Sequence, residues 1–448
     1  MAILVQKTVE TTYKLPAALR KPSFYLGCDP EFFVRRKGDG KIVGAEILLG
    51  NKDAQLDGTW SQNEKVIVDG VQLEINPAPT DCRANLANSI MSCMRALHQK
   101  LEGTDLTTDF AASVEISPEE LNKLHEESRK FGCAPSTNSH TGTTSVIPVK
   151  GDEYFKRSAG GHIHIGIGKN YHKDPEAIKR LCYMMDLFVG IPGVLLDRDP
   201  GNIERRKVYG RAGEYRLPPH GFEYRTPSNF WLRGYPIMSL IFGLTKLASA
   251  IAIDSYNIDK TDDKVLAKRG VLYLKNKGYD TTDLYQYIID SIDIKEVADI
   301  INNNDFKGAY RIWNTLEDIL FNQVAIYDTN FGIDKHRTQH FHYIIWKGLD
   351  ELFPLNRDIV GYWANLPEGH SGGISDYYAS NVIRDGISND KGAIIEYAIL
   401  SLMGIPYDKK KIINNESKPV KRPRRTGKTK TTGDKKLPAR RRSRVQTS

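Results

Sequence analysis

Residues 161–168 alternate between imidazole or glycine and isoleucine, reading Gly-His-Ile-His-Ile-Gly-Ile-Gly. A period of two predicts a β-strand, in which successive side chains point to opposite faces of a sheet. His162 and His164 therefore share one face, whereas Ile163 and Ile165 share the other. Isoleucines on one face predict a packed core there. The chain is thus expected to build a sheet with one covered face and one face that carries titratable groups.

Three other short segments repeat this pattern of polar groups on an apolar strand. They are residues 27–33 (Gly-Cys-Asp-Pro-Glu-Phe-Phe), 69–77 (Asp-Gly-Val-Gln-Leu-Glu-Ile-Asn-Pro) and 221–227 (Gly-Phe-Glu-Tyr-Arg-Thr-Pro). In an extended strand Asp29 and Glu31 share a face, and so do Glu223 and Arg225. Glu74 emerges between two apolar neighbours. One such residue is typical of a solvated strand face, but four segments together predict a functional site.

The remaining patterns predict an α+β fold, an antiparallel sheet with helices packed on it. We expect an N-terminal extension over residues 1–20, a sheet-forming part over 21–232 and a mostly helical part over 233–407. Pro30 lacks an N–H, which predicts that its strand begins there or lies at a sheet edge. Strands are expected at 24–28, 31–34, 42–47, 66–68, 71–75, 111–116, 161–168 and 222–226, with turns at 39–40 and 69–70. Helices are expected at 83–101, after an N-cap at Ser117, at 175–196 with a bend at 192–193, and over much of 229–403.

Charge is divided unevenly along the chain. The formal net charge is +8, yet residues 408–448 hold 16 Lys and Arg against 3 acidic residues, a net +13 that leaves −5 for the rest. This tail has no aromatic and few aliphatic residues, so it cannot bury enough apolar surface to offset chain entropy, which predicts disorder. Its charge is expected to attract an acidic partner or nucleic acid, or to act only as a solubilising tether.

The rest of the chain has the composition of a globular protein, since 40% of the 448 residues are apolar. No apolar run is judged long enough for a membrane span, and residues 1–20 mix charges into weak hydrophobicity, which argues against a signal peptide. The five cysteines lack CxxC spacing, which fits a reducing compartment and predicts a cytoplasmic location. They are Cys28, Cys82, Cys93, Cys133 and Cys182.

The polar set suits hard divalent cations and phosphate. Magnesium prefers carboxylate oxygens and leaves coordination positions for water and substrate phosphates, and one imidazole among them is acceptable for magnesium or manganese. Arg211, Arg216 and Arg225 lie in or just before the fourth segment. Guanidinium groups supply two-pronged contacts to phosphate oxygens. Together these features predict a site for phosphoryl transfer.

In this order, the four segments resemble the active-site strands of the glutamine synthetase and glutamate–cysteine ligase superfamily. The greatest likeness is to its phage-encoded carboxylate–amine ligases, through four motifs over roughly residues 25–232. These are the DPEFF start, the DGxxxExNPAP segment, the GGHIHIG strand and the GxEYRTPSNxW end. The ordered set is far more specific than any single motif.

The resemblance implies a half-barrel sheet and a role for each matching residue. Glu31, Glu74, Glu223 and His162 would bind magnesium or manganese, with the shorter Asp29 as a second-rank ligand. His164, Arg211 and Arg225 would contact the ATP phosphates, and Arg225 and Arg216 would stabilise the transferring phosphoryl group. Glu74 is also expected among the catalytic residues, and a nearby carboxylate is expected to accept the proton of the amine. The implied reaction joins a small-molecule or peptide carboxylate to an amine through an acyl phosphate, in the host cytoplasm if the protein is phage-encoded.

Other interpretations stay open. A phosphotransferase of the same fold would stop before ligation, and a zinc hydrolase would use His162 and His164, although a third histidine is not evident. A non-catalytic protein could bind nucleic acid or a virion through the tail. His336, His340 and His342 lie in a stretch with helical character and are interpreted as an ordinary helix face.

Overall fold

The computed structural model describes residues 25–61, 63–81, 83–130, 135–145, 155–167, 171–172, 174–259, 284–320, 341–342 and 344–366. The chain divides into two compact units, Met1–Ile405 and Pro406–Ser448. The second unit lies wholly outside the described residues, as does the extension 1–20. The expectations for these two segments therefore stay predictions.

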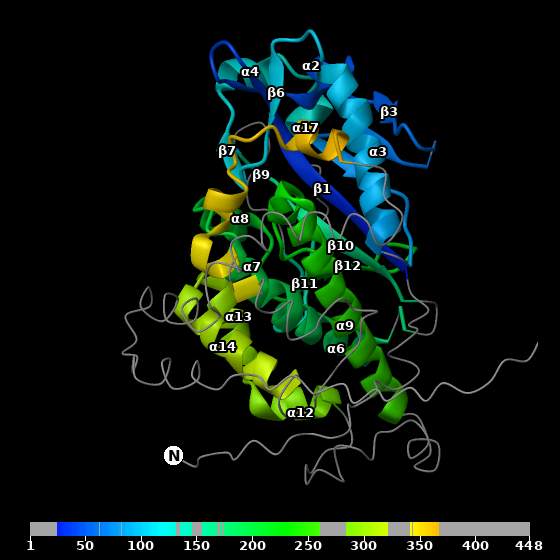
Figure 1. Ribbon diagram of the computed structural model, residues 1–448, viewed down its shortest axis with the longest axis vertical. Helices are drawn as coiled ribbons and strands as arrows, with labels where there is room; N and C mark the ends of the chain where they lie inside the picture. Colours follow the sequence, from blue (N-terminus) through cyan, green and yellow to red (C-terminus); the bar gives the residue numbers. More distant parts are fainter. Residues whose placement is uncertain are drawn as a thin grey trace, which may run out of the picture. The chain divides into compact units, whose positions relative to one another are not determined.

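The described strands form a ten-stranded sheet and a separate pair, and every pairing between them is antiparallel (Figure 1). The main path is β3-β4-β5-β1-β10-β12-β11-β8, with β2 and β6 also paired to β1, while β7 pairs with β9. The predicted combination of an antiparallel sheet with helices is confirmed. The bounds are β1 Tyr25–Arg36, β2 Ile42–Val43, β3 Gln55–Asp57, β4 Lys65–Asp69, β5 Gln72–Asn76, β6 Leu106–Asp109, β7 Ser113–Glu115, β8 Thr137–Asn138, β9 Lys156–Ser158, β10 Gly161–Gly166, β11 Glu214–Arg216 and β12 Phe222–Tyr224.

Helices dominate the second half of the described chain, as predicted. Their bounds are α2 Ala45–Leu49, α3 Arg83–Leu101, α4 Pro118–Asn122, α5 Glu126–Arg129, α6 Pro175–Met185, α7 Ile191–Leu196, α8 Gly201–Val208, α9 Tyr235–Asp259, α12 Leu284–Ser291, α13 Ile294–Asn302, α14 Phe306–Asp318, α16 Leu349–Leu352 and α17 Ile359–Ala364. A π-helical turn, η1, covers Asp186–Gly190, and a 3-10 turn, η2, covers Asn229–Arg233.

Strand β1 corrects the prediction of two strands separated near Pro30. It continues through Pro30 and pairs with β10 on one side and with β5 on the other. The N–H of Leu26 donates toward the β5 side, to Thr80. If residue 30 were not proline, its N–H would point to this same side of β1. It would lie between the Leu26–Thr80 bridge and the first pair with β5, which is at Glu31. The missing donor is tolerated inside the sheet because no ladder bond is required there.

The turns and caps mostly follow the prediction. Gly40 and Gly70 have φ of 71° and 60° in the expected hairpin turns, and the Ser117 hydroxyl accepts a hydrogen bond at the start of α4. The expected strand 42–47 is wrong, because the chain leaves β2 after Val43 and starts α2. Gly44 makes this change of direction, and a Cβ there would lie 2.4 Å from Leu124 Cδ2.

The expected helix 175–196 is interrupted earlier than predicted. The irregular stretch is η1, which precedes Pro192. Within η1, the buried Asp186 carboxylate accepts hydrogen bonds from the Tyr224 hydroxyl at 2.6 Å and the Gly213 N–H at 2.9 Å. The wider helical turn that begins at Asp186 therefore lies where the helix is hydrogen-bonded to Tyr224 of β12 and to Gly213. No proline within this turn predicts the interruption.

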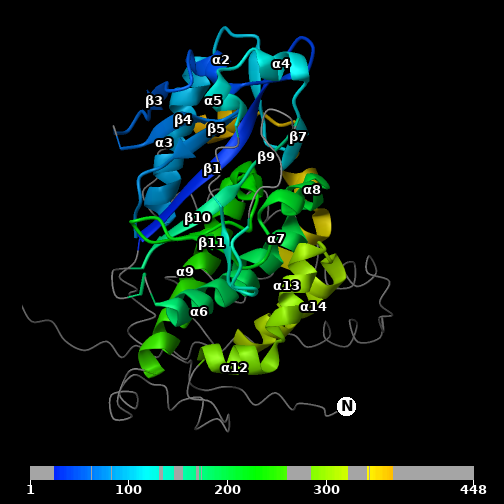
Figure 2. The same cartoon turned by 180° about the vertical axis from the view of Figure 1, so that it is seen from behind.

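Apolar residues on the far side of the polar strands form the main core. Leu26, Ile163 and Ile165 belong to it together with Leu86 and Ile90 of α3. Helix α3 lies alongside β1 in both views (Figures 1 and 2) and packs against β3, β4 and β5. One face of the sheet is thus covered, as the alternation in residues 161–168 predicted.

Helix α9 corrects the expectation that no apolar run reaches the length of a membrane span. Tyr235–Ile253 is long and apolar enough by length and composition alone, with a mean hydropathy of 1.7. Within the described structure 72% of this stretch is buried. The helix packs against α6, α3 and η2, as a core helix does.

Some expectations fall on residues outside the described ranges. Cys82, Cys133, His336 and His340 are among them. Cys28, Cys93 and Cys182 are buried free thiols, and His342 Nε2 lies 2.7 Å from Glu317 Oε2.

Candidate active site

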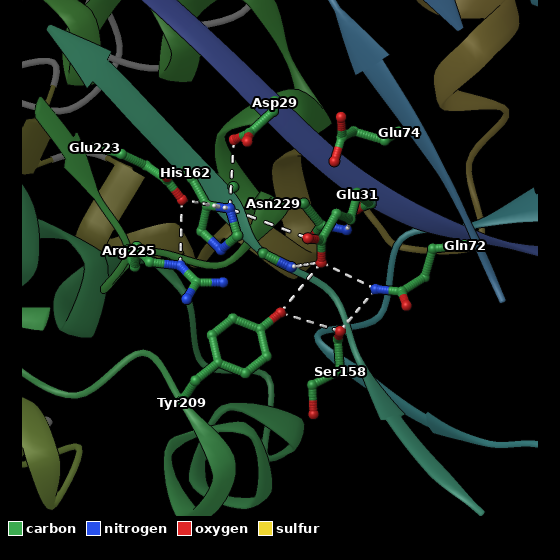
Figure 3. Close-up of polar contacts among 12 residues, drawn as sticks. Asp29, Glu31, Gln72, Glu74, Ser158, His162, Tyr209, Glu223, Arg225 and Asn229 are labelled. Atoms are coloured by element: carbon green, nitrogen blue, oxygen red, sulfur yellow. Dashed lines mark hydrogen bonds and ion pairs between the residues drawn. The ribbon is translucent and has the colours of Figure 1, made fainter. Parts of the chain in front are cut away.

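Strand register brings the polar side chains of all four segments to one face of the sheet. Because directly paired residues in neighbouring strands point the same way, the pairing fixes which groups meet. The pairs are Glu31 with Glu74, Asp29 with His162, His164 with Glu223, and Glu223 with Arg216. The expected shared faces of Asp29 with Glu31 and of His162 with His164 are thus present in the strand register. Figure 3 shows Asp29, Glu31 and His162 together.

Gly160 and Gly161, at the start of β10, allow the backbone to pack closely under this face. A Cβ on Gly161 would lie 2.2 Å from the Ser228 carbonyl oxygen, and one on Gly160 would lie 2.2 Å from His162 Nε2. Trp231 Nε1 donates to the Gly161 carbonyl at 3.0 Å. The Nε2 side of His162 is therefore covered by backbone, which leaves Nδ1 as the nitrogen that faces the acidic side chains.

His162 Nδ1 faces three carboxylates. It lies 3.3 Å from Asp29 Oδ1, 3.6 Å from Glu223 Oε1 and 4.0 Å from Glu31 Oε1. An octahedral magnesium with ligands at about 2.1 Å places neighbouring ligand atoms about 3.0 Å apart and opposite ones about 4.2 Å apart. These separations fit ligands that surround one small cation.

Two groups of ligand atoms lie along this face. Asp29, His164 and Glu223 have ligand atoms within 4.8 Å of one another; together with His162 we call them the mixed group. Glu31, Asp69 and Glu74 form a second set within the same limit, which we call the acidic group.

Burial and charge act differently on the mixed group. Burial opposes the ionisation of Asp29, but His164 and His162 outweigh it and hold the Asp29 pKa well below its usual range. His162 and Arg216 likewise overcome burial to lower the pKa of Glu223. Burial also works against a charged His164, but Asp29 and Glu223 outweigh it and raise the His164 pKa. Burial, helped by Arg225, lowers the pKa of His162.

Among the described residues, Arg216 and Arg225 act on the acidic group, but they do not outweigh its burial and like charges. Burial, followed by the charge of Asp69, raises the pKa of Glu31 to about 8. Burial, followed by the charge of Asp29, raises the pKa of Asp69 and takes that of Glu74 well above its usual value. Buried like charges disfavour ionisation, so this arrangement calls for a proton or a cation between the carboxylates.

Glu31 is held by several donors on one of its oxygens. Its Oε2 accepts hydrogen bonds from Gln72 Nε2 at 2.9 Å, from the Gly160 N–H at 2.7 Å and from the Tyr209 hydroxyl at 3.1 Å. The other oxygen, Oε1, is the one near His162. The dashed lines in Figure 3 converge on this carboxylate.

Two of the three predicted arginines reach the group. Arg216 makes a two-pronged contact with Glu223, with both distances 2.7 Å, and its side chain is 29% exposed. Arg225 Nε lies 3.2 Å from Glu223 Oε1, and its Nη1 donates to Ser136 Oγ at 2.6 Å. Arg211 departs from the prediction: its guanidinium donates to the carbonyls of Arg206 and Lys207 at the end of α8. Arg211 thus caps a helix, because the turn after α8 folds its side chain back along the chain.

A cavity of about 570 Å³ adjoins the mixed group. Tyr25, Gly27, Pro77, His164 and His220 are among its lining residues. His164 connects the two, since its Nε2 lies 3.0 Å from Asp29 Oδ2 and its Nδ1 lies 2.9 Å from His220 Nε2. The cavity lies in the size range of small-molecule sites.

The donor set fits a divalent cation. Within the described ranges, neither ring nitrogen of the buried His162 has a hydrogen-bond partner, although buried polar atoms normally have one. A cation beside Nδ1 would supply the missing partner, and one within the acidic group would supply the missing positive charge. All three residues of the acidic group offer the oxygen ligands that magnesium prefers.

The sequence interpretation missed several residues of the site. Asp69 was read only as part of a turn, yet a two-residue turn pairs it with Gln72, two positions before Glu74. That register could have been inferred. Tyr209, Ser136 and His220 come from irregular segments between elements, where no periodicity indicates direction. Asp29, ranked second for its short side chain, lies between both histidines.

The family comparison bears on the second half of this site. Residues 135–271 match the sequence model of a family described as phage phiEco32-like COOH.NH2 ligase, type 2. This match confirms the resemblance to carboxylate–amine ligases predicted from the motifs. It covers the histidine strand and the Glu-Tyr-Arg segment.

Other comparisons add little. No curated protein matches the chain. A solved structure titled as a bifunctional glutathione synthetase from Pasteurella multocida is similar over 77% of this chain, with 11% identity and a TM-score of 0.31. The chain spans 56% of that protein's length. A TM-score this low does not establish a shared fold.

Proposed function

We propose that the protein is an ATP-dependent carboxylate–amine ligase that uses magnesium or manganese and forms an acyl phosphate. The observation that carries the proposal is the pair of ligand groups along β1 with Arg216 and Arg225 beside them. Two cation positions next to guanidinium groups suit transfer of the γ-phosphoryl group of ATP. The family matched by residues 135–271 is a carboxylate–amine ligase family. We further propose that the sheet is of the glutamine synthetase half-barrel type.

The two ligand groups would hold separate cations. Asp29, His162 and Glu223 would hold one, with His164 at its edge, and Glu31, Asp69 and Glu74 would hold the other. When bound, the cations neutralise charge on the phosphates and on the reacting carboxylate. The short Asp29 suffices in this arrangement because it faces His162 directly across the strands.

The nucleotide would occupy the cavity beside the mixed group. His164 lines this cavity and contacts Asp29, so its ring can face the phosphates. The 29% exposed Arg216 can reach phosphate oxygens while it still balances Glu223. Arg225 is buried and fixed by Ser136, which suits a cation that stabilises developing charge without having to reorient.

The reaction then follows in two steps. An oxygen of the carboxylate substrate attacks the γ-phosphorus of ATP, and ADP leaves. The amine nitrogen of the second substrate attacks the acyl carbon, the C–O bond to phosphate breaks, and inorganic phosphate leaves. Glu74 would accept the proton that the amine loses.

The test is to incubate the full chain with ATP, Mg²⁺, hydroxylamine and pools of carboxylic acids. An acyl phosphate reacts with hydroxylamine to give a hydroxamate, so each productive acid yields hydroxamate, ADP and phosphate in equal amounts. Glu296→Gln, which lies on the exposed α13–α14 surface and pairs with Arg311, is the matched control and should behave as wild type. Formation of AMP and pyrophosphate, or full activity in EDTA, would overturn the proposal.

The same experiment separates the rival phosphotransferase. A kinase-like reaction would give a stable phosphorylated product and ADP without hydroxamate. A non-catalytic binding protein, the other rival, would leave ATP intact in every pool.

We also propose a cytoplasmic site of action, with the basic tail as a tether to an acidic partner or nucleic acid.

A further inference from the structure

Tyr209 stands between the two ligand groups, although it belongs to neither. It follows α8 directly, and its ring is buried, with 4% of its surface exposed. The next residue, Gly210, has φ of +85°, and a Cβ there would lie 2.3 Å from Arg205 Nη1. This turn requires glycine, and it directs the Tyr209 side chain under the polar face. Figure 3 shows the ring below the Arg225 guanidinium, with its hydroxyl directed toward Glu31.

The hydroxyl group of Tyr209 completes the donor set of one Glu31 oxygen. It lies 3.1 Å from both Glu31 Oε2 and the Ser158 carbonyl, and its single proton can go to only one of them. Gln72 Nε2 already donates to both acceptors, at 2.9 and 2.7 Å. Because hydrogen bonds to an ionised carboxylate are stronger than those to a neutral carbonyl, we assign the tyrosine proton to Glu31. With three donors on Oε2, Glu31 presents Oε1 alone to a cation.

The ring of Tyr209 acts on Arg225. The Arg225 guanidinium carbon lies 5.2 Å from the ring centroid, a cation–π distance, and His162 meets the same ring edge-on at 5.8 Å. The same guanidinium pairs with Glu223 through Nε at 3.2 Å and donates to Ser136 Oγ at 2.6 Å. The ring therefore adds a further contact that positions Arg225.

We propose that Tyr209 is a positioning residue of the ligase site: its hydroxyl limits Glu31 to one ligand oxygen, and its ring holds the Arg225 guanidinium in place. The inference rests on the proposed function for the role of Arg225. The arrangement of Glu31 toward a cation can be measured without turnover, with Mn²⁺ alone as the probe.

Two variants separate the roles of hydroxyl and ring. Tyr209→Phe removes only the proton donor, so the affinity for Mn²⁺, measured by electron paramagnetic resonance or calorimetry, should fall about tenfold, the size typical of lost outer-shell partners. Its kcat at saturating Mn²⁺ should stay within about threefold of wild type. Tyr209→Leu removes the ring as well, and its kcat should fall about a hundredfold even at saturating Mn²⁺, because Arg225 loses one of the contacts that position it.

Tyr285→Phe is the matched control, since Tyr285 is also 4% exposed and also carries an arginine, Arg180, over its ring. It should leave the Mn²⁺ affinity unchanged. If wild type and Tyr209→Phe bind Mn²⁺ equally, the inference is wrong. It is also wrong if the Phe and Leu variants lose only thermal stability. If wild type binds Mn²⁺ tightly and Tyr209→Phe weakens it, but no acid yields hydroxamate, then the proposed function fails while the positioning of Glu31 stands.

Discussion

The mixed and acidic groups lie side by side on one sheet face, yet they solve the problem of buried charge differently. In the mixed group, histidines and Arg216 balance the acids, and the pKa values of Asp29 and Glu223 are lowered. In the acidic group, three carboxylates crowd together, and the pKa of each is raised. The first group is balanced by the protein itself, whereas the second depends on a proton or a cation supplied from outside.

This difference predicts which of the two ligand groups should respond to metal concentration. A group with its own counter-charges gains less from a cation than one whose repulsion the cation relieves. The acidic group should therefore couple cation binding to folding stability, whereas the mixed group should hold its geometry in either state. Variants in each group can test this contrast.

The largest expected effect comes from Glu31→Gln, because Glu31 contacts both groups. The change keeps the shape and the Oε2 hydrogen bonds to Gln72 and Gly160 but removes a ligand charge. Metal-dependent turnover should fall by about a thousandfold or more, while the circular dichroism spectrum stays native. Glu223→Gln should behave similarly. Full activity in both variants, or unfolding of both, would mean that these are not cation ligands.

The next effect is a difference in sign between the groups. In metal-free protein, Glu74→Gln removes a repelling charge and should raise the melting temperature, whereas Asp29→Asn leaves His164 without its partner and should lower it. For either variant, each kcal/mol of change in the free energy of unfolding should shift the melting temperature by about 3 °C. Scanning calorimetry in EDTA measures both. Shifts of the same sign would remove the basis of the contrast.

The third effect is a pH dependence of the metal-free protein. The pKa of Glu31 is raised from its usual 4.5 to about 8, so between these values the folded state binds a proton that the unfolded state has released. The stability from this group is full below pH 4.5 and is lost as the pH rises to about 8. The melting temperature of wild type should therefore fall relative to Glu31→Gln over this window. Saturating Mg²⁺ should abolish the relative fall, and a flat difference in EDTA would contradict it.

The smallest effect is expected outside both groups. Truncation after Tyr407 should leave the melting temperature and ATP turnover unchanged, since residues 408–448 hold few groups that could join a core. Binding to nucleic acid, if the tail provides it, should disappear on truncation and weaken steeply with salt in the full chain. Loss of melting temperature on truncation would show that the tail is part of the folded body.

The sequence sufficed where side-chain direction follows from periodicity. His162 and His164, Asp29 and Glu31, and the core isoleucines lie on the predicted faces because a strand allows only two directions. Asp69 depended on the register of a hairpin, which a turn signal implies but does not state.

The sequence failed where direction depends on tertiary contacts. Tyr209 and Ser136 lie in connecting segments, and Arg211 folds back onto α8 although its type and spacing suited phosphate. Pro30 predicts a strand start or a sheet edge, and this is wrong because propensity ignores which side of the strand needs a donor. These positions are decided by neighbours that are distant in the sequence.

The spacing along β1 has a consequence for how such a site can change. Asp29 and Glu31 are two positions apart, so their Cα atoms lie about 6.6–6.8 Å apart, a length set by the rise of a strand. β10 and β5 hold that strand on its two sides. The distance between the cation positions is therefore a property of the backbone, and substrate-facing loops can diverge without altering it. A single inserted or deleted residue between Asp29 and Glu31 would turn one of them into the core, so this interval should tolerate no change in length.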